Sequence, residues 1–197
     1  VGFGGIPIQR VSDEEAVQAL RRALDLGVNF IDTAAGYSDS QRKIGLAIRD
    51  CREDIILASK SGATSRDGLL RELEKGLNDI GRDYFDLYQL HGANSPERWD
   101  SMRASGGALE GMIAAHDQGM IRHIGVTSHS LDLAVELVDV DEFETMQFPF
   151  NLVTREPEKE LIPKCRERNT GFIVMKPLCG GQYDNARLAF LFLNGFP

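Results

Sequence analysis

Residues 55–60 read Ile55-Ile56-Leu57-Ala58-Ser59-Lys60, and residues 85–91 read Phe85-Asp86-Leu87-Tyr88-Gln89-Leu90-His91. Each stretch is a mostly apolar run that is too short for a helix and ends on a titratable side chain. In a closed parallel β/α barrel, the carboxyl ends of all strands meet on the face that carries the chemistry. The pattern therefore predicts two barrel strands, with Lys60 and His91 at one mouth.

The strand-like run before them, Val28-Asn29-Phe30-Ile31-Asp32, ends in the same way on a carboxylate. Tyr37 follows it five residues later. We therefore expect four titratable groups to lie together at the strand ends: Asp32, Tyr37, Lys60 and His91.

Strand-like and helix-period segments alternate along the whole chain. We expect strands at 1–4, 28–32, 55–59, 84–90, 121–127, 145–148 and 171–175. We expect helices at 13–26, 40–49, 66–80, 108–118, 131–138, 158–168 and 185–193, with a loop over 92–107. Ser12 and Glu15 form a capping box at the start of the first helix, and Ser130 can cap the fifth, over 131–138.

Near-continuous apolar strands joined by helices predict a parallel α/β architecture. A doubly wound sheet would usually carry a Gly-rich phosphate loop after its first strand, and Gly4-Gly5-Ile6-Pro7 lacks that fingerprint. The prediction is a (β/α)8 TIM barrel, with one incomplete barrel domain over residues 1–197. Seven β/α units can be counted, so we expect the eighth unit to lie outside this chain, leaving open edges on the first and seventh strands.

The composition of the chain excludes some classes of binding partner. The 197 residues carry a net charge of −8, so no basic face for nucleic acid or an anionic membrane is expected. No apolar run approaches the roughly 20 residues of a membrane span. The three cysteines form no Cys-x-x-Cys motif, so a reducing, cytoplasmic location is the default expectation. The histidines show no metal-ligand spacing, and nothing in the sequence indicates an oligomeric state.

The four strand-end groups match the needs of carbonyl reduction, in which an acid protonates the developing alkoxide. A tyrosine can supply that proton if its pKa, near 10 when unperturbed, moves toward neutrality. A lysine ammonium about 4 Å away interacts with a phenolate by roughly 4 kcal/mol at an effective dielectric of 20, or about three pKa units. An aspartate keeps a buried lysine charged, and a histidine can orient the substrate oxygen. We therefore expect Lys60 to lower the pKa of Tyr37.

The chain resembles the aldo-keto reductase superfamily. Residues 30–37 (FIDTAAGY) are similar to that family's Asp-Thr-Ala-x-x-Tyr segment, and residues 58–60 and 86–91 are similar to its lysine and histidine strands. Residues 121–128 (IRHIGVTS) resemble its fifth strand, and 146–148 and 175–178 its sixth and seventh strand ends. The resemblance covers nearly the whole chain in the same order.

This resemblance implies a carbonyl reductase that uses NADP(H), with NAD(H) also open, on a small-molecule aldehyde or ketone. It implies Tyr37 as general acid, tuned by Lys60 and Asp32, with His91 orienting the carbonyl. It also implies cofactor-binding residues at the ends of the later strands, where Ser128 stands in place of the common Asn and Met175 in place of a frequent aromatic residue: Thr127, Ser128, Gln147, Met175, Lys176, Pro177 and Leu178.

Residues that bind the phosphates and adenine in this family lie mainly beyond its seventh strand. We therefore expect the 197-residue chain to bind NADP(H) poorly. The opening residues 2–9 resemble a branch whose members often carry a C-terminal iron–sulfur segment, so a cluster is expected only in a segment beyond residue 197.

Two other functions remain open. A nicotinamide-binding barrel could act as a regulatory or redox-sensing subunit without significant turnover. A Schiff-base aldolase could use Lys176, although that would leave Tyr37 and His91 without roles. Outside the four groups, His129 is expected to be exposed, Cys179 to be a buried small residue, and Trp99 to be either a pocket wall or part of loop packing.

Overall fold

The computed structural model describes residues 1–51 and 55–196. Their contacts divide them into two compact units. Unit 1 comprises the described residues of 1–91 and 97–124, and unit 2 those of 92–96 and 125–197. The following description takes each unit by itself.

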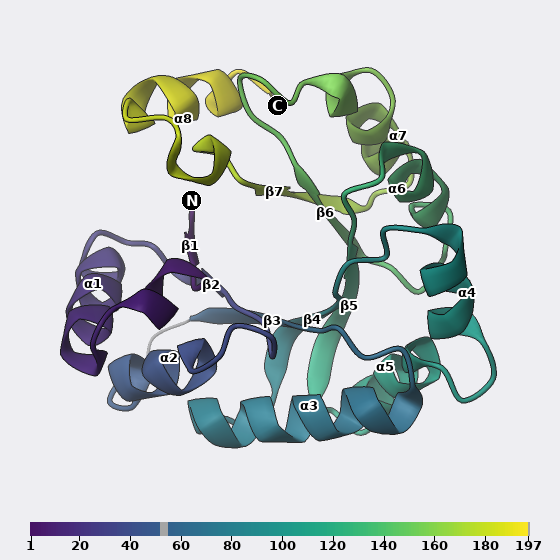
Figure 1. The fold of residues 1–197 in the computed structure, drawn as a ribbon, viewed down its shortest axis with the longest axis horizontal. Coiled ribbons are helices and arrows are strands. Elements are labelled where there is room, and N and C mark those ends of the chain that lie inside the picture. The colour runs from purple at the N-terminus through teal and green to yellow at the C-terminus, as the bar shows by residue number, and fades with distance from the viewer. Residues whose placement is uncertain (52–54, 197) are drawn as a thin grey trace. The chain divides into compact units, whose positions relative to one another are not determined.

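The order of the strands in the sheet is their order in the chain (Figure 1). The pairing is parallel among the first four strands and among the last three. Unit 1 holds four complete strands and the start of β5. Unit 2 holds the end of β5 and two further strands. The strands are β1 Gly2–Gly4, β2 Phe30–Asp32, β3 Ile56–Ser61, β4 Phe85–Leu90, β5 Ile121–Thr127, β6 Thr145–Pro149 and β7 Gly171–Met175.

The helices alternate with the strands as the apolar periodicity predicts. They are α1 Asp13–Asp25, α2 Ser40–Ile48, α3 Arg66–Ile80, α4 Pro96–Arg103, α5 Ala108–Asp117, α6 Leu131–Leu137, α7 Leu161–Glu167 and α8 Ala186–Asn194. Three short 3-10 helices add to them: η1 Pro7–Arg10, η2 Glu156–Glu158 and η3 Cys179–Gly181.

Side-chain caps set several helix starts where the sequence places them. The Ser12 hydroxyl accepts the amide of Glu15, and the Glu15 carboxylate accepts the amide of Ser12, which completes the expected capping box of α1. Ser65 caps α3, and Gly81 ends it with φ at +72°, a conformation that glycine adopts without strain. Ser130 caps α6 as expected.

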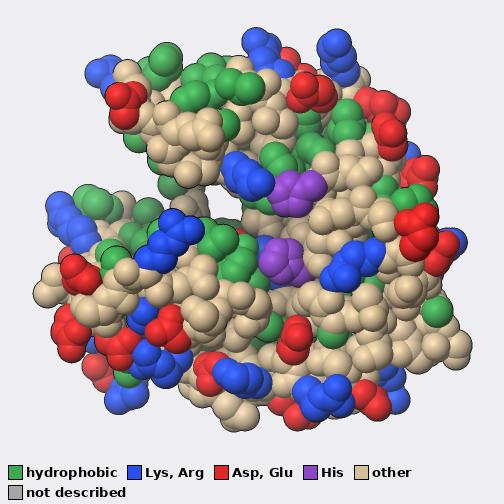
Figure 2. All heavy atoms as spheres, viewed as in Figure 1, with side chains coloured by type: hydrophobic (Ala, Val, Ile, Leu, Met, Phe, Trp, Pro, Cys, Tyr) green, Lys and Arg blue, Asp and Glu red, His purple; other side chains and the backbone are tan. Residues whose placement is uncertain are grey.

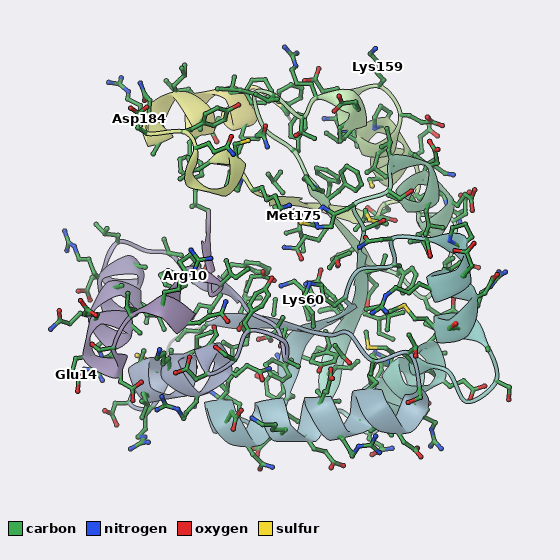
Figure 3. All side chains as sticks on the ribbon, viewed as in Figure 1. Arg10, Glu14, Lys60, Lys159, Met175 and Asp184 are labelled. Atoms are coloured by element: carbon green, nitrogen blue, oxygen red, sulfur yellow. The ribbon has the colours of Figure 1, made fainter. Side chains whose placement is uncertain are left out.

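In unit 1, α2 and α3 pack closely because α2 presents a glycine at their contact. A Cβ atom at Gly45 would lie 2.5 Å from the Asp79 carbonyl oxygen and 2.8 Å from the Ile80 Cα. This approach places α2, and therefore the turn that precedes it, against the rest of the unit. On β3, Ser59 accepts a hydrogen bond from Gln41 of α2, so by strand alternation Lys60 points to the opposite face of the sheet (Figure 3).

Two sequence expectations are wrong at the level of elements. The stretch 92–107, expected as a loop, contains α4, whose two buried side chains are Trp99 and Met102. Helix α7 begins at Leu161 and not at residue 158, because Pro163 lacks an amide hydrogen and is tolerated only in the first turn of a helix, where a start at Leu161 places it.

Unit 2 closes around an aromatic cluster at its C-terminal side. Phe150 lies 5.5 Å from Phe192 of α8 and 5.0 Å from Phe196, measured between ring centroids. The outer surface of α8 is apolar as well, since hydrophobic side chains gather over it in Figure 2 and Leu188 and Leu191 are more than half exposed. Among the described residues, no helix combines the length and hydropathy of a membrane span.

Candidate active site

The centre of the candidate site in unit 1 is an ion pair between neighbouring strands. Lys60 on β3 is 2% exposed, and its Nζ lies 2.7 Å from Oδ2 of Asp32 at the end of β2. The same Nζ donates to the Thr33 carbonyl oxygen at 2.6 Å. The other carboxylate oxygen of Asp32 accepts a 3.4 Å hydrogen bond from Nε2 of buried Gln89, a partner that the sequence analysis missed. Each carboxylate oxygen therefore has a fixed donor.

Tyr37 and His91 complete the group. The Tyr37 ring lies below the Lys60 ammonium, 5.2 Å from its centroid, and meets the His91 ring edge-on with 5.9 Å between centroids. Nη2 of Arg98 on α4 donates to the Gly62 carbonyl at 2.6 Å and to the His91 carbonyl at 3.3 Å, which ties the residues after β3 and β4 together. The four groups expected at the strand ends therefore lie within one small region of unit 1.

The expected effect of Lys60 on Tyr37 is wrong for this structure. Burial raises the pKa of Tyr37 to about 12, and the negative charge of Asp32 adds to the rise. The ammonium directs its hydrogen bonds to Asp32 and the Thr33 carbonyl and lies over the face of the phenol ring. Among the described residues, no group donates to or accepts from the Tyr37 hydroxyl.

Lys60 itself is held in balance by two opposing effects. Burial lowers the pKa of Lys60 below its ordinary value, and the charge and hydrogen bond of the Asp32 carboxylate oppose that change. A buried ammonium without such a partner would lose its proton more readily. Asp32 is thus the group that keeps a positive charge beside the phenol.

The candidate cofactor residues at the end of β5 and on β6 lie in unit 2 and are buried. The hydroxyl of Thr127 accepts the amide of Gly92 at 2.8 Å, and the amide of Ser128 donates to the Gln147 carbonyl at 3.2 Å. The hydroxyl of Ser128 donates to the Ala93 carbonyl at 2.6 Å and accepts the amide of Ser130. Ser128 therefore already serves to hold the loop in this structure.

The residues after β7 form a tight turn. Lys176 has φ at +57°, and its carbonyl accepts hydrogen bonds from the Asn151 side chain at 3.0 Å and from the Cys179 amide at 2.9 Å. Met175 ends β7 and is half-buried (Figure 3), Lys176 is exposed, and Pro177 and Leu178 are half-buried. This turn places the Lys176 cation at the surface.

A pocket of about 590 Å³ opens beside this turn, entirely within unit 2. Its wall includes Lys176 together with residues that the sequence analysis did not assign to a site. His129 is exposed as expected, lines this pocket, and has a pKa lowered by partial burial and by the nearby charge of Lys176. Cys179, expected to be buried, is only half-buried and also lines the pocket, since it begins the short turn η3 and not a helix or strand of the core.

Trp99 is 8% exposed in α4, and the Arg103 guanidinium lies 5.8 Å from its ring centroid. The ring is therefore buried and is stacked on a cation of its own helix. Within residues 1–51 and 55–196, no group of three or more potential ligand side chains is arranged to hold a metal ion.

The chain belongs to the Aldo/keto reductase family, whose sequence profile matches residues 1–189. It is 30% identical over 194 residues to the aldo-keto reductase YhdN of Bacillus subtilis, covering 91% of this chain and 56% of that protein. It is 31% identical over 182 residues to methylglyoxal reductase YeaE of Escherichia coli, covering 87% of this chain and 61% of that protein. The chain thus spans little more than half the length of these relatives.

Solved structures give the same assignment. An aldo-keto reductase from Bacillus halodurans in its holo form aligns with a TM-score of 0.81 at 25% identity, covering 92% of this chain and 63% of that chain. An aldo/keto reductase from Klebsiella pneumoniae in complex with NADP and acetate aligns with a TM-score of 0.79 at 26% identity, over 93% and 66%. The fold is therefore the family's parallel (β/α)8 barrel, of which seven strands lie in the described residues.

Proposed function

We propose that this chain carries the proton-donating part of an NAD(P)H-dependent carbonyl reductase that converts an aldehyde or ketone to an alcohol. The observation that carries the proposal is the convergence of a phenol, an ammonium, a carboxylate and an imidazole in unit 1. Lys60 and Asp32 are 2.7 Å apart, and the Tyr37 ring contacts both Lys60 and His91. Structural ion pairs are common, but an imidazole and a free phenol beside one are the parts that a reductase needs.

The proposed roles follow from the donors available. When bound, the nicotinamide supplies a hydride to the carbonyl carbon. The Tyr37 hydroxyl gives its proton to the carbonyl oxygen and becomes a phenolate, and His91 orients that oxygen by a hydrogen bond. The Lys60 ammonium stabilises the phenolate, and Asp32 keeps that ammonium charged. A proton from solvent then restores the phenol.

The raised pKa of Tyr37 makes the resting phenol a weaker acid than an ordinary tyrosine. With a pKa of about 12, the phenol is protonated at neutral pH, and its proton transfer depends on a positive charge that stabilises the phenolate. The nearby ammonium acts once the phenolate forms, because only then is there a negative charge for it to stabilise. We therefore place the contribution of Lys60 in the transition state and product more than in the resting state.

The residues of unit 2 fit a phosphorylated nicotinamide cofactor. The pocket of about 590 Å³ is lined by the Lys176 cation, the His129 imidazole, the Glu156 carboxylate and the polar side chains of Asn151 and Thr154. These groups can bind a phosphate or an amide, and we assign the cofactor to Thr127, Ser128, Gln147, Met175, Lys176, Pro177 and Leu178. NADP(H) is the preferred form because family members have been solved with NADP and NADPH.

The substrate class is a small carbonyl compound. One relative is a methylglyoxal reductase, so α-oxoaldehydes belong in any first test. An aldolase using Lys176 receives no support, because that side chain is exposed and lacks the desolvation that activates a Schiff-base lysine. We further propose that the protein works in the cytoplasm, without a nucleic-acid or membrane partner.

The test is oxidation of NADPH, followed at 340 nm, over a panel of aldehydes, α-oxoaldehydes, ketones and quinones. NADPH is supplied at millimolar concentration, because this chain lacks much of the length of its relatives. Turnover with any carbonyl compound supports the reductase. Clear NADPH binding without turnover would contradict it and favour the alternative, a regulatory or redox-sensing barrel.

A further inference from the structure

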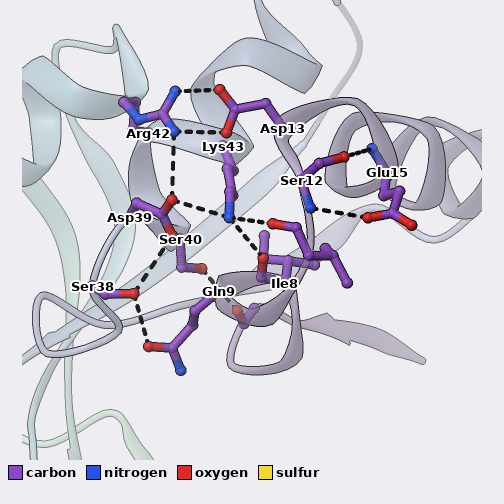
Figure 4. Close-up of polar contacts among 12 residues, drawn as sticks. Ile8, Gln9, Ser12, Asp13, Glu15, Ser38, Asp39, Ser40, Arg42 and Lys43 are labelled. Carbon is purple, nitrogen blue, oxygen red and sulfur yellow. Dashed lines mark hydrogen bonds and ion pairs between the residues drawn. The ribbon is translucent and has the colours of Figure 1, made fainter.

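Helix α2 carries a buried lysine that the proposed reaction does not use. Lys43 is 4% exposed, and its Nζ donates to the Ile8 carbonyl at 3.0 Å and to the Val11 carbonyl at 2.8 Å (Figure 4). It also pairs with Oδ2 of Asp39 at 3.0 Å. An ammonium has three N–H groups, and these three acceptors match them. A lysine buried this far requires such partners, so Lys43 links the segments that supply them. We call this set of contacts the Lys43 junction.

This junction joins two segments that are far apart in the sequence. Ile8 and Val11 belong to the segment between β1 and α1, residues 5–12, which includes η1. Asp39 belongs to the turn of residues 37–40, which we call the Tyr37 turn. Two further contacts join the same segments: the Ser38 hydroxyl donates to the Gln9 side chain at 3.0 Å, and the Ser40 hydroxyl donates to the Gly5 carbonyl at 2.9 Å.

The Tyr37 turn has a backbone that needs such support. The amide of Tyr37 donates to the Ala34 carbonyl at 3.0 Å, and the amide of Ser40 donates to the Tyr37 carbonyl at 2.8 Å. Between them Ser38 has φ at +38°, in the left-handed region that residues other than glycine rarely adopt. A conformation of this kind persists only where its surroundings enforce it.

We propose that Lys43 is a positioning residue for the proton donor, holding the Tyr37 turn against residues 5–12 so that the Tyr37 hydroxyl keeps its place. This rests on the proposed function of Tyr37. Lys43 touches neither the phenol nor any other group of the tetrad, and it acts through the backbone of the turn. Because a displacement of about 1 Å at a reacting group can cost on the order of a hundredfold in rate, a loosened turn should appear mainly in kcat.

The adjacent residue Arg42 provides a matched control on the same helix. Its guanidinium pairs with both carboxylate oxygens of Asp13 at 2.7 and 2.8 Å and with Asp39 at 3.4 Å (Figure 4). Its side chain is 45% exposed, however, and exposed ion pairs contribute little. Replacing Arg42 therefore tests whether the loss of any positive charge at this end of α2 has the same effect as the loss of Lys43.

The experiment compares Lys43→Met and Arg42→Met with the wild type by two measurements. One is hydrogen exchange followed by peptide mass spectrometry, and the other is steady-state NADPH oxidation with the best carbonyl substrate.

For Lys43→Met we expect the rate of hydrogen exchange in residues 5–12 and 37–40 to rise about tenfold, with the rate in α3 unchanged. We expect kcat to fall about tenfold and the KM for the carbonyl compound to stay within about twofold. Arg42→Met should match the wild type in hydrogen exchange, in kcat and in KM. If Lys43→Met does not fold, Lys43→Gln, which keeps an N–H donor, replaces it with the same expected direction.

Three results would overturn the proposal: unchanged exchange in residues 37–40, faster exchange with unchanged kcat, or an equal loss of kcat in Arg42→Met. Failure of the proposed function would give a different experimental result. A wild type without turnover would remove the catalytic role of Tyr37, and with it the catalytic part of this proposal. The exchange measurement would still decide whether Lys43 holds the turn.

Discussion

The contact between Asp32 and Lys60 shows how one carboxylate sets the charge of a site. Lys60 is almost fully buried, and burial alone would favour its neutral form. The carboxylate stands 2.7 Å from the ammonium and opposes that effect of burial. Removing one partner of such a pair leaves the other buried and uncompensated, which typically costs about 3–5 kcal/mol.

Asp32→Asn should therefore lower the free energy of unfolding by about 3 kcal/mol at neutral pH, measured by urea unfolding. The loss should shrink as pH rises toward 10.5, the ordinary pKa of lysine. With its folded pKa depressed further, Lys60 binds fewer protons in the folded than in the unfolded state over that range, so stability rises with pH. Asp13→Asn, which removes an exposed partner of Arg42, should cost far less than Asp32→Asn because solvent screens that pair. Equal losses in the two variants would contradict the role given to Asp32.

Tyr37 should ionise at a higher pH than an ordinary phenol. Its pKa is raised to about 12 by burial and by Asp32, against an ordinary value near 10. The difference in absorbance at 295 nm between wild type and Tyr37→Phe, followed against pH, should therefore show a transition about two units above the ordinary one. A transition below pH 10 would show instead that Lys60 dominates, as the sequence alone suggested.

At the scale of residues, the positions of the strand-end groups could be predicted from the sequence, but the direction of the Tyr37 pKa shift could not. Asp32, Lys60 and His91 end strands, so the strand pattern alone was enough to predict that they converge. The direction of the Tyr37 pKa shift was not predictable, because it depends on where the Lys60 ammonium points. Lys43 was missed, although it lies four residues before buried Ala47 on the apolar stripe of α2, a position where a lysine is unusual.

At the scale of elements, the closeness of α2 and α3 fixes the turn that carries Tyr37. Gly45→Ala should destabilise the protein by about 2 kcal/mol, because the added methyl would meet backbone atoms of Asp79 and Ile80 that cannot move independently. Gly4→Ala is the control, since nothing lies within 4 Å of its added Cβ. Thermal unfolding of the two variants should separate them. A stable Gly45→Ala would show that α2 can shift, and with it the Tyr37 turn.

Helix boundaries were predicted well where local chemistry decides them. The bounds of α3, Arg66–Ile80, match the expectation because Ser65 caps its start and Gly81 ends it. Helix α4 was missed because it is short and its apolar side chains, Trp99 and Met102, are too few to show a helical period. Tertiary packing rather than pattern makes that segment helical.

At the scale of the whole molecule, the fold class was predictable because seven apolar strands alternate with helices and lack a Gly-rich phosphate loop. That expectation of a parallel (β/α)8 barrel is confirmed by the strand order and by the solved relatives. The expectation of one domain over residues 1–197 remains a prediction, and the described contacts form two units. No pattern in the sequence predicted the boundary between the two units.

The share of each relative that this chain covers leads to a binding prediction. The chain spans 56% of one curated relative and 61% of another. We propose that the 197-residue chain binds NADPH with a dissociation constant well above micromolar, because its resemblance to the aldo-keto reductases implies that much of the phosphate and adenine binding lies beyond the seventh strand. Isothermal titration calorimetry measures this directly. Micromolar binding would show instead that the residues of unit 2 suffice for the cofactor.

The central claim is that Tyr37 donates the proton in a carbonyl reduction. The most direct measurement compares wild type, Tyr37→Phe and Tyr84→Phe in oxidation of millimolar NADPH by the best aldehyde. We predict that Tyr37→Phe lowers kcat by about 100-fold or more with little change in KM, while Tyr84→Phe, whose ring still stacks on Arg122, matches the wild type. Equal rates in Tyr37→Phe and wild type would contradict the account.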